Sequence, residues 1–446
     1  MRLYITFAVI FFCLLLQQAV SEEQRLSLRD AIKTALVNND DVKAFESSVS
    51  AKKAEIGISR SFLLPHINLD ESFVRTNNPT GVFSIKLNQE RFTESDFELQ
   101  NLNNPDPVSD FQTNVSIEQP ILAIPELLSI KASKKDYLAR SEAFARQKEF
   151  IAFKVIDSYI RVQTAKEFLG VSEKALEDAR EQLRIADKRY KSGLGLYSDT
   201  LRASTAVTEA EQQIVSTQKN LKVAKRTLGL LLGLSESVDT DKEQTEIPLY
   251  DMDYYTDSSL DRKDIKSLEL KHENATTNVK IAEAGYIPKI GVRGTYQLND
   301  SDTPFGDQGS SWFIAGFMKW EIFNGTRRGY QRAQAKHRAA EIEQMLDGLQ
   351  KKVSLRVYES HLAVDETKKN IELAEAALKT AEEGTRLVQK RYENSLSPFV
   401  DLLDAQVNLD RARANLVAKK NEYRISVARL SFESGTIFQD LGIEPR

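Results

Sequence analysis

The chain has 446 residues, of which 28% are charged, and its formal net charge is −4. This polar composition argues against a helical membrane protein, and the lack of a strong basic excess argues against a nucleic-acid binder, which needs clustered Lys and Arg to displace counterions from phosphates. The single cysteine, Cys13, lies in an N-terminal apolar run, so the rest of the chain offers no thiol for disulfides, metal sites or nucleophilic catalysis.

Residues 1–21 are predicted to be a cleaved secretory signal peptide. Arg2 precedes the apolar run LYITFAVIFFCLLL, which is short for a membrane span, and the small residues AVS at 19–21 suit signal peptidase. Cys13 lies inside this run rather than after it, which argues against a lipid anchor. The alternative is an uncleaved anchor.

Residues 22–64 predict a helix that starts near Ser27 or Asp30 and ends before Pro65. Residues 65–120 then predict a β-hairpin with a long loop, because apolar and polar residues alternate. The apolar positions are Ile67, Leu69 and Phe73, then Phe83, Ile85 and Leu87, and, after a turn-rich segment at 101–110, Phe111, Val115 and Ile117. We expect these strands to have one apolar and one polar face.

Residues 121–233 predict a long helix, a turn and a return helix. No proline follows Pro125 as far as Arg189, so a single helix roughly 90 to 100 Å long is expected. The return helix carries an apolar stripe whose members step by four and three residues, as in a coiled coil. These members are Ala203, Val207, Ala210, Ile214, Thr217, Leu221, Ala224, Leu228 and Leu231.

The second half of the chain repeats this order after a polar, acidic linker. The predicted segments are the linker at 234–264, a helix at 265–287, a β-hairpin at 288–323, a long helix with turn and return helix at 324–440, and a tail at 441–446. In the second hairpin, Ile290, Val292, Tyr296 and Leu298 alternate with polar residues, and Trp312, Ile314, Met318, Trp320 and Ile322 share one face.

The duplication is most evident at the two turns between long and return helices. The sequences RYKSGLGLYSDTLRA from Arg189 and RYENSLSPFVDLLDA from Arg391 align without a gap at an offset of 202 residues. Because Pro65 and Pro288 lie 223 positions apart but Gln119 and Trp320 only 201, the first hairpin is 22 residues longer than the second.

The predicted strands leave two sheet edges open. An open edge cannot lie in hydrocarbon, because its backbone groups would be unpaired, so one chain cannot close a membrane barrel. Three chains would supply twelve strands, an even number within the range of bacterial barrels. Aromatic residues near the strand ends suit the two membrane interfaces; the alternative is that they form the core of a soluble sheet. These residues are Phe73, Phe83, Phe111, Tyr296, Trp312 and Trp320.

The order of these features resembles the TolC family of outer-membrane efflux proteins. The resemblance rests on the signal peptide, the duplicated helix–Pro–strand–strand unit, QPIL at 119–122, EIFNG at 321–325 and the two RY-x3-L-x4-D-x-L-x-A turns, and it covers essentially the whole chain after the signal peptide. It implies a mainly α-helical fold with a transmembrane β part. It also implies a homotrimer, in which a 12-stranded β-barrel is continued by a long α-helical coiled-coil barrel.

The resemblance also implies location and partners. The strands would lie in the outer-membrane lipid of a Gram-negative-type bacterium, and the helices would extend into the periplasm. The turns would be periplasmic tips that dock on an adaptor, or membrane fusion protein, and on an inner-membrane RND or ABC transporter. The implied function is the exit duct of a tripartite efflux or type I secretion system.

In this family the tips are gated by carboxylates that project into the lumen, and the matching residues are Asp401 and Asp404. Because they are spaced i, i+3, they share one helix face, and three chains would form a ring of six carboxylates that favours cations. Two alternatives stay open. Asp401 could cap the return helix, and Asp404 could lie on a solvated face.

The family's tips are held shut by a Tyr, an Arg and an Asp. Tyr392 and Asp199 match the Tyr and the Asp, but Ser397 occupies the Arg position. The resemblance therefore predicts a different latch, which uses Arg189 or Arg391.

The first tip is also the better candidate for adaptor docking. The residues that match the family's docking groove are Gly193, Leu194, Ser198 and Asp199. The second tip departs from the pattern at Ser395 and Pro398, which puts docking there in doubt.

Two other classes of function fit the sequence less well. A periplasmic or secreted coiled-coil scaffold without a pore would explain the helices, but it leaves the amphipathic strands unassigned. No catalytic residue, metal site or cofactor is predicted, because the histidines are far apart in sequence and no Gly-rich phosphate loop is present. The histidines are His66, His272, His337 and His361. The cargo, whether drug, metal or protein, cannot be predicted from this chain.

Overall fold

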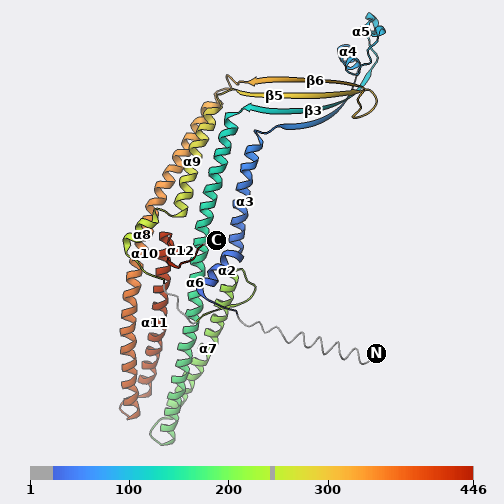
Figure 1. Cartoon of the computed structure of the whole chain (residues 1–446). Helices are drawn as coiled ribbons and strands as arrows, with labels where there is room; N and C mark the ends of the chain where they lie inside the picture. The colour runs from blue at the N-terminus through green and yellow to red at the C-terminus, as the bar shows by residue number, and fades with distance from the viewer. Residues whose placement is uncertain (1–23, 242–246, 445–446) are drawn as a thin grey trace, which may run out of the picture. The chain divides into compact units, whose positions relative to one another are not determined.

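The computed structural model describes residues 24–241 and 247–444 (Figure 1). The predicted signal peptide therefore lies outside the described residues. The described chain divides into two compact units. The sheet unit comprises residues 48–141 and 267–346, and the helical unit comprises residues 24–47, 142–241, 247–266 and 347–444.

The sheet unit contains four antiparallel strands in the order β2-β3-β5-β6 (Figure 1). They are β2 (His66–Thr76), β3 (Val108–Leu122), β5 (Lys289–Asp300) and β6 (Gly309–Lys319). The pairing of β3 with β5 joins the two predicted hairpins into one sheet. Within the described chain, β2 and β6 are its two open edges.

The long loop of the first hairpin is helical. It contains α4 (Pro79–Asn88), the 3-10 helix η1 (Glu94–Phe97) and α5 (Leu99–Asn103). The predicted strand with Phe83, Ile85 and Leu87 is therefore wrong. Asn78 caps α4 by accepting a hydrogen bond from the backbone N–H of Gly81 at 3.1 Å, and Pro79 occupies the first turn, where a missing N–H costs nothing.

Two other sequence predictions need correction at element ends. The single helix predicted over 22–64 is two helices, α2 (Leu28–Asn38) and α3 (Asp40–Ser61), because the Asn39 side chain caps α3 by accepting from Asp41 N at 2.9 Å. Ser27 caps α2, as predicted. Trp320 and Ile322, predicted to continue the last strand, follow the end of β6.

Two long helix hairpins dominate the helical unit, and the first parts of their long helices, up to residues 141 and 346, belong to the sheet unit (Figure 1). The first consists of α6 (Ile124–Lys191) and α7 (Tyr197–Leu231), and the second of α10 (Arg327–Glu393) and α11 (Phe399–Ser434), which is followed by α12 (Ile437–Asp440). At 68 residues, α6 is about 100 Å long, which agrees with the expected length. The predicted stripe of α7 faces inward, since Ala203, Thr217 and Leu228 are buried.

The predicted linker is ordered on both sides of residues 242–246, which lie outside the described chain. β4 (Val238–Thr240) pairs in parallel with β1 (Gln24–Leu26), and α8 (Met252–Ser259) packs on α11 through Tyr255. α9 (Lys263–Ala284) begins the second repeat. Over residues 24–241 and 247–444, no helix combines the length and apolar character needed to cross a membrane.

Candidate functional site

The two turns between long and return helices have the same backbone conformation, as their repeated sequences predict. In the first tip, the backbone N–H of Leu194 donates to the carbonyl of Arg189 at 2.9 Å. In the second tip, the backbone N–H of Leu396 donates to the carbonyl of Arg391 at 2.8 Å. Each turn also needs one left-handed residue, which is Gly193 at φ 74° in the first tip and Ser395 at φ 61° in the second. The second tip thus holds a side chain where the first has none.

Arg189 joins the two tips (Figure 1 shows the two turns at the same end of the helical unit). Its Nη1 donates to the carbonyl of Glu393 at 2.6 Å, and its Nη2 donates to Ser395 Oγ at 2.8 Å. Arg391, the equivalent residue of the second tip, donates to the carbonyl of Leu396 in its own turn at 3.5 Å. The sequence proposed either arginine as the latch, and the geometry favours Arg189.

Tyr392 is buried beneath this arginine. Its ring centroid lies 4.8 Å from Arg189 Cζ, a cation–π distance, and 5.2 Å from the ring of Phe399. Burial, reinforced by the negative charge of Asp199, raises the pKa of the Tyr392 hydroxyl. Within the described chain that hydroxyl has no hydrogen-bond partner, so Tyr392 and Asp199 are brought together without bonding to each other.

An apolar cluster closes the space between the hairpins behind the tips. It consists of Ala186 from α6, Ala203 from α7, Tyr392 from α10, and Phe399 and Leu402 from α11, each at most 3% exposed. The small alanines allow the four helices to approach closely. The tips therefore combine an apolar cluster with one polar bridge, made by Arg189.

The two predicted gate carboxylates, Asp401 and Asp404, are exposed in a single chain. The residue that precedes α11 is Pro398, so Asp401 lies in the first turn rather than at the cap, and the capping alternative is wrong. Ser397 Oγ donates to Asp401 Oδ2 at 2.6 Å, which orients this carboxylate at the positive end of the helix dipole. Neither carboxylate is paired with a cation in the described chain.

Three of the four predicted docking residues line a cavity of about 590 Å³ between the two tips. Gly193, Leu194 and Asp199 line it from the first tip, and Tyr392 and Ser395 from the second. The fourth, Ser198, is exposed but does not line the cavity. Two exposed side chains that the sequence analysis did not single out, Leu196 and Tyr197, extend this surface, and they are 67% and 57% exposed.

The sheet has one apolar and one polar face, as the alternation predicted. One cross-strand row consists of Leu69, Val115, Tyr296 and Trp312, and the adjacent row consists of Asp70, Asn114, Gln297 and Ser311. The apolar row is well exposed, from 38% at Val115 to 71% at Trp312. The opposite face carries an ion pair between Arg293 and Glu118 at 2.5 Å. Such a sheet suits lipid on one side and water on the other.

Known proteins are similar to this chain in sequence and in fold. A family model described as "Outer membrane efflux protein" matches residues 31–234 and 255–436. Nodulation protein T of Rhizobium leguminosarum bv. trifolii is 22% identical, but the match spans less than two thirds of either protein, 63% of this chain and 62% of the relative. The alkaline protease secretion protein AprF of Pseudomonas aeruginosa is 20% identical over 98% of this chain and 89% of its own.

A solved structure has the same architecture. The Campylobacter jejuni CmeC outer membrane channel superposes with a TM-score of 0.75 at 18% identity, covering 94% of this chain and 90% of that one. The predicted fold class, a duplicated helix–strand–strand–helix–helix unit, is therefore confirmed.

Proposed function

Because this chain belongs to the outer membrane efflux protein family, we propose that it is the exit duct of a tripartite efflux or type I secretion system, gated at its helix tips. The family consists of outer-membrane transport channels rather than enzymes, and its members extend into the periplasm of Gram-negative bacteria. The observation that carries the gating proposal is the bridge from Arg189 to Glu393 and Ser395, which ties the second hairpin to the first. A pore-less scaffold would leave the amphipathic sheet without a purpose.

The sheet supports a homotrimer. Its edges, β2 and β6, are open in one chain, and pairing β6 of one copy with β2 of the next closes a ring without unpaired backbone. Three copies give twelve strands. The apolar face with Trp312 then contacts outer-membrane lipid, and the face with the Arg293–Glu118 pair lines a water-filled lumen.

Gating follows from the tips. With the bridge intact, the second hairpin is held against the first, and in a trimer Asp401 and Asp404 form a carboxylate ring near the closed end. A channel opens when the three second hairpins move away from the first. Such a ring favours cations over anions.

The partners of the duct follow from the surface around the tip cavity. Leu194, Leu196 and Tyr197 present apolar area that suits the helical end of a periplasmic adaptor, which in turn couples to an RND or ABC transporter. The relative AprF is named for secretion of a protease, so ducts of this fold are not confined to small molecules.

Conductance in planar bilayers tests this function and the carboxylate ring together. The wild-type protein is expected to insert as a low-conductance, cation-preferring channel. Asp401→Asn with Asp404→Asn should lower the cation-to-anion permeability ratio several-fold, because the ring loses its charge. The matched control is Asp253→Asn with Asp257→Asn, which removes two exposed charges from α8. An unchanged ratio in the tip variant would contradict the ring, and the absence of channels from correctly folded wild-type protein would contradict the function.

A further inference from the structure

The two hairpins meet along α6 and α11, and polar side chains bridge this seam between the stacked rings of Phe153 and Phe432 and the apolar cluster at the tips. The contacts pair Gln163 with Arg424 at 2.7 Å, Glu167 with Asn421 at 3.0 Å, and Gln182 with Gln406 at 3.1 Å. Because later positions on α6 pair with earlier positions on α11, the helices run antiparallel. The paired positions on α6 and on α11 recur at helical spacing, so the polar groups form a continuous stripe.

The seam inside the second hairpin is different. Val357 and Val364 of α10 pack with Val427 and Leu430 of α11 in one buried apolar cluster. Burying apolar area makes such seams costly to open, whereas polar partners regain hydrogen bonds to water when they separate. Between residues 163 and 182 of α6, the seam between the hairpins is therefore less costly to open than the apolar seam within the second hairpin.

The seam has one dense cluster of charges. Arg413 Nη1 donates to Asp178 Oδ2 at 2.6 Å and to Asp410 Oδ1 at 3.2 Å. Gln406 Nε2 donates to the same two oxygens, at 3.1 Å and 3.0 Å. Lys174 lies 3.4 Å from the other oxygen of Asp178. The Arg413 guanidinium and the Gln406 amide thus each bond to both carboxylates, Asp178 of the first hairpin and Asp410 of the second.

This cluster is separate from the tip. Asp178 precedes Gly193 by 15 residues of helix and turn, which corresponds to about 22 Å along the axis. The carboxylates are about a quarter exposed, at 21% for Asp178 and 27% for Asp410, and Gln406 is buried. The hydrogen bonds that cross the seam are therefore partly shielded from water.

We propose that Asp178, Asp410 and Arg413 form a second latch, which holds the second hairpin against α6 independently of Arg189 and which tightens when Asp410 binds a proton. The proposal rests on the gating function proposed above and names further positioning residues for it. The tip bridge and the seam latch each restrict the duct, so the release of either one raises the conductance, and full opening requires the release of both.

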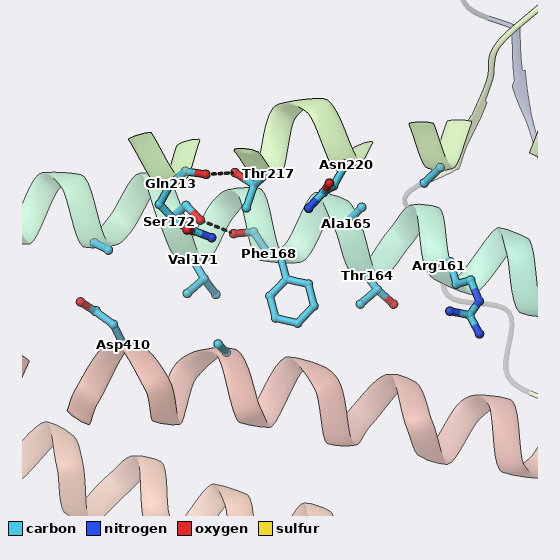
Figure 2. A pocket seen from close by; sticks show the side chains of 13 residues that line it. Arg161, Thr164, Ala165, Phe168, Val171, Ser172, Gln213, Thr217, Asn220 and Asp410 are labelled. Atoms are coloured by element: carbon cyan, nitrogen blue, oxygen red, sulfur yellow. Dashed lines mark hydrogen bonds between the residues drawn. The ribbon is translucent and has the colours of Figure 1, made fainter. Parts of the chain in front are cut away.

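A cavity beside the latch gives Asp410 access to protons. Asp410 points from α11 into a cavity of about 630 Å³ that α6 and α7 also line (Figure 2). The groups that α7 presents there, Gln213 and Asn220, are uncharged. At the far end, Arg161 is paired with Asp157 of its own helix at 2.8 Å. The charged groups that face Asp410 are therefore those of the latch and Lys174.

The direction of the pH effect follows from this environment. Burial raises the pKa of Asp410, and the nearby charge of Asp178 adds to this, although Gln406 and Arg413 oppose it. A carboxyl group whose pKa is raised in one conformation stabilises that conformation at low pH, and the stabilisation is lost as the pH rises through the raised pKa. The latch should accordingly be tightest in acid and weaken above the ordinary carboxyl range.

The test measures single-channel conductance of the full-length trimer between pH 5 and pH 7.5. Wild-type conductance should rise several-fold across this range. Asp410→Asn, which stays neutral, should remain near the acid value throughout, and Arg413→Ala should give high conductance at both ends. Arg411→Ala is the matched control, since Arg411 is exposed on the same helix and contacts Asn408 at 3.4 Å.

A cysteine pair separates a loose latch from a misfolded variant. Because the only native cysteine is Cys13, Glu167→Cys with Asn421→Cys gives a single crosslinking pair across the seam, at a contact outside the latch. Oxidation should fix every correctly folded variant in the low-conductance state, and reduction should restore its difference from wild type. If Arg413→Ala behaves like Arg411→Ala, or if Asp410→Asn keeps the wild-type pH dependence, the second latch is overturned. A wild-type protein that forms no channel would instead overturn the proposed function.

Discussion

Gly193 and Ser395 occupy the same left-handed position in the two tips. Gly193 has no side chain, whereas the Ser395 hydroxyl accepts a hydrogen bond from Arg189. Nothing lies within 4 Å of a Cβ placed on Gly193, so the only cost of a side chain there is the backbone conformation. Gly193→Ala should therefore lower the free energy of unfolding by about 1 kcal/mol. Chemical denaturation followed by circular dichroism measures this, and an unchanged midpoint would contradict the assigned turn.

The serine of the second tip provides the reciprocal substitution. Ser395→Gly relieves the left-handed conformation, worth about 1 kcal/mol, but removes the hydrogen bond to Arg189, so stability should change little. Ser395→Ala keeps the strain and loses the bond. The alanine variant should thus be the less stable of the two, by about 1 kcal/mol.

At the scale of elements, the helical loop of the first hairpin is fixed to the sheet. Gln89 Nε2 donates to the carbonyl of Ser109 and to Asp110 Oδ1, both at 2.8 Å, and Asn299 donates to the other oxygen of Asp110 at 2.8 Å. All three polar side chains are buried. The loop is thus an ordered cap on the strand ends.

Two glycines of β6 test this attachment. A Cβ on Gly309 would lie 2.0 Å from the carbonyl oxygen of Asn88, whereas nothing lies within 4 Å of a Cβ on Gly316. Gly309→Ala should displace the end of α4 and make residues 79–106 several-fold more sensitive to protease. Gly316→Ala, on the same strand, should leave digestion unchanged. Equal resistance of both variants would show that the cap does not depend on this contact.

These elements also show what sequence patterns can predict. The alternation around Leu69, Val115 and Tyr296 extends over enough residues to define a strand, and it placed the apolar face correctly. The alternation at Phe83, Ile85 and Leu87 is too short to establish a strand, and the residues buried there are Val82, Ile85 and Gln89, which have helical spacing. The Asn78 cap and the packing of the Phe83 ring on the Phe92 ring, with centroids 4.9 Å apart, stabilise a helix in this segment.

The candidate site could be predicted only in part, because some of its features depend on local sequence and others on contacts between distant segments. The repeated turns follow from local sequence, so Gly193, Tyr392 and the paired carboxylates could be named without a structure. The contacts of Arg189 with Glu393 and Ser395 join residues more than 200 positions apart, and they depend on how one hairpin packs against the other. Local spacing carries no information about that packing.

At the scale of the whole molecule, we propose a trimeric duct whose closed state is held between the two hairpins of each chain. The amphipathic sheet suits the outer membrane, and the polar contacts between the hairpins suit their separation during opening. The central part of this proposal is that Arg189 keeps the duct closed. The internal duplication supplies a control, because Arg391 lies at the equivalent position of the other tip.

The most direct measurement compares the single-channel conductance of Arg189→Ala and Arg391→Ala at one pH and salt concentration. Arg189→Ala removes the bonds to the second tip and should raise the conductance several-fold, whereas Arg391→Ala removes one long bond within its own turn and should stay near wild type. Equal conductance of the two variants, or a larger effect of Arg391→Ala, would contradict the account.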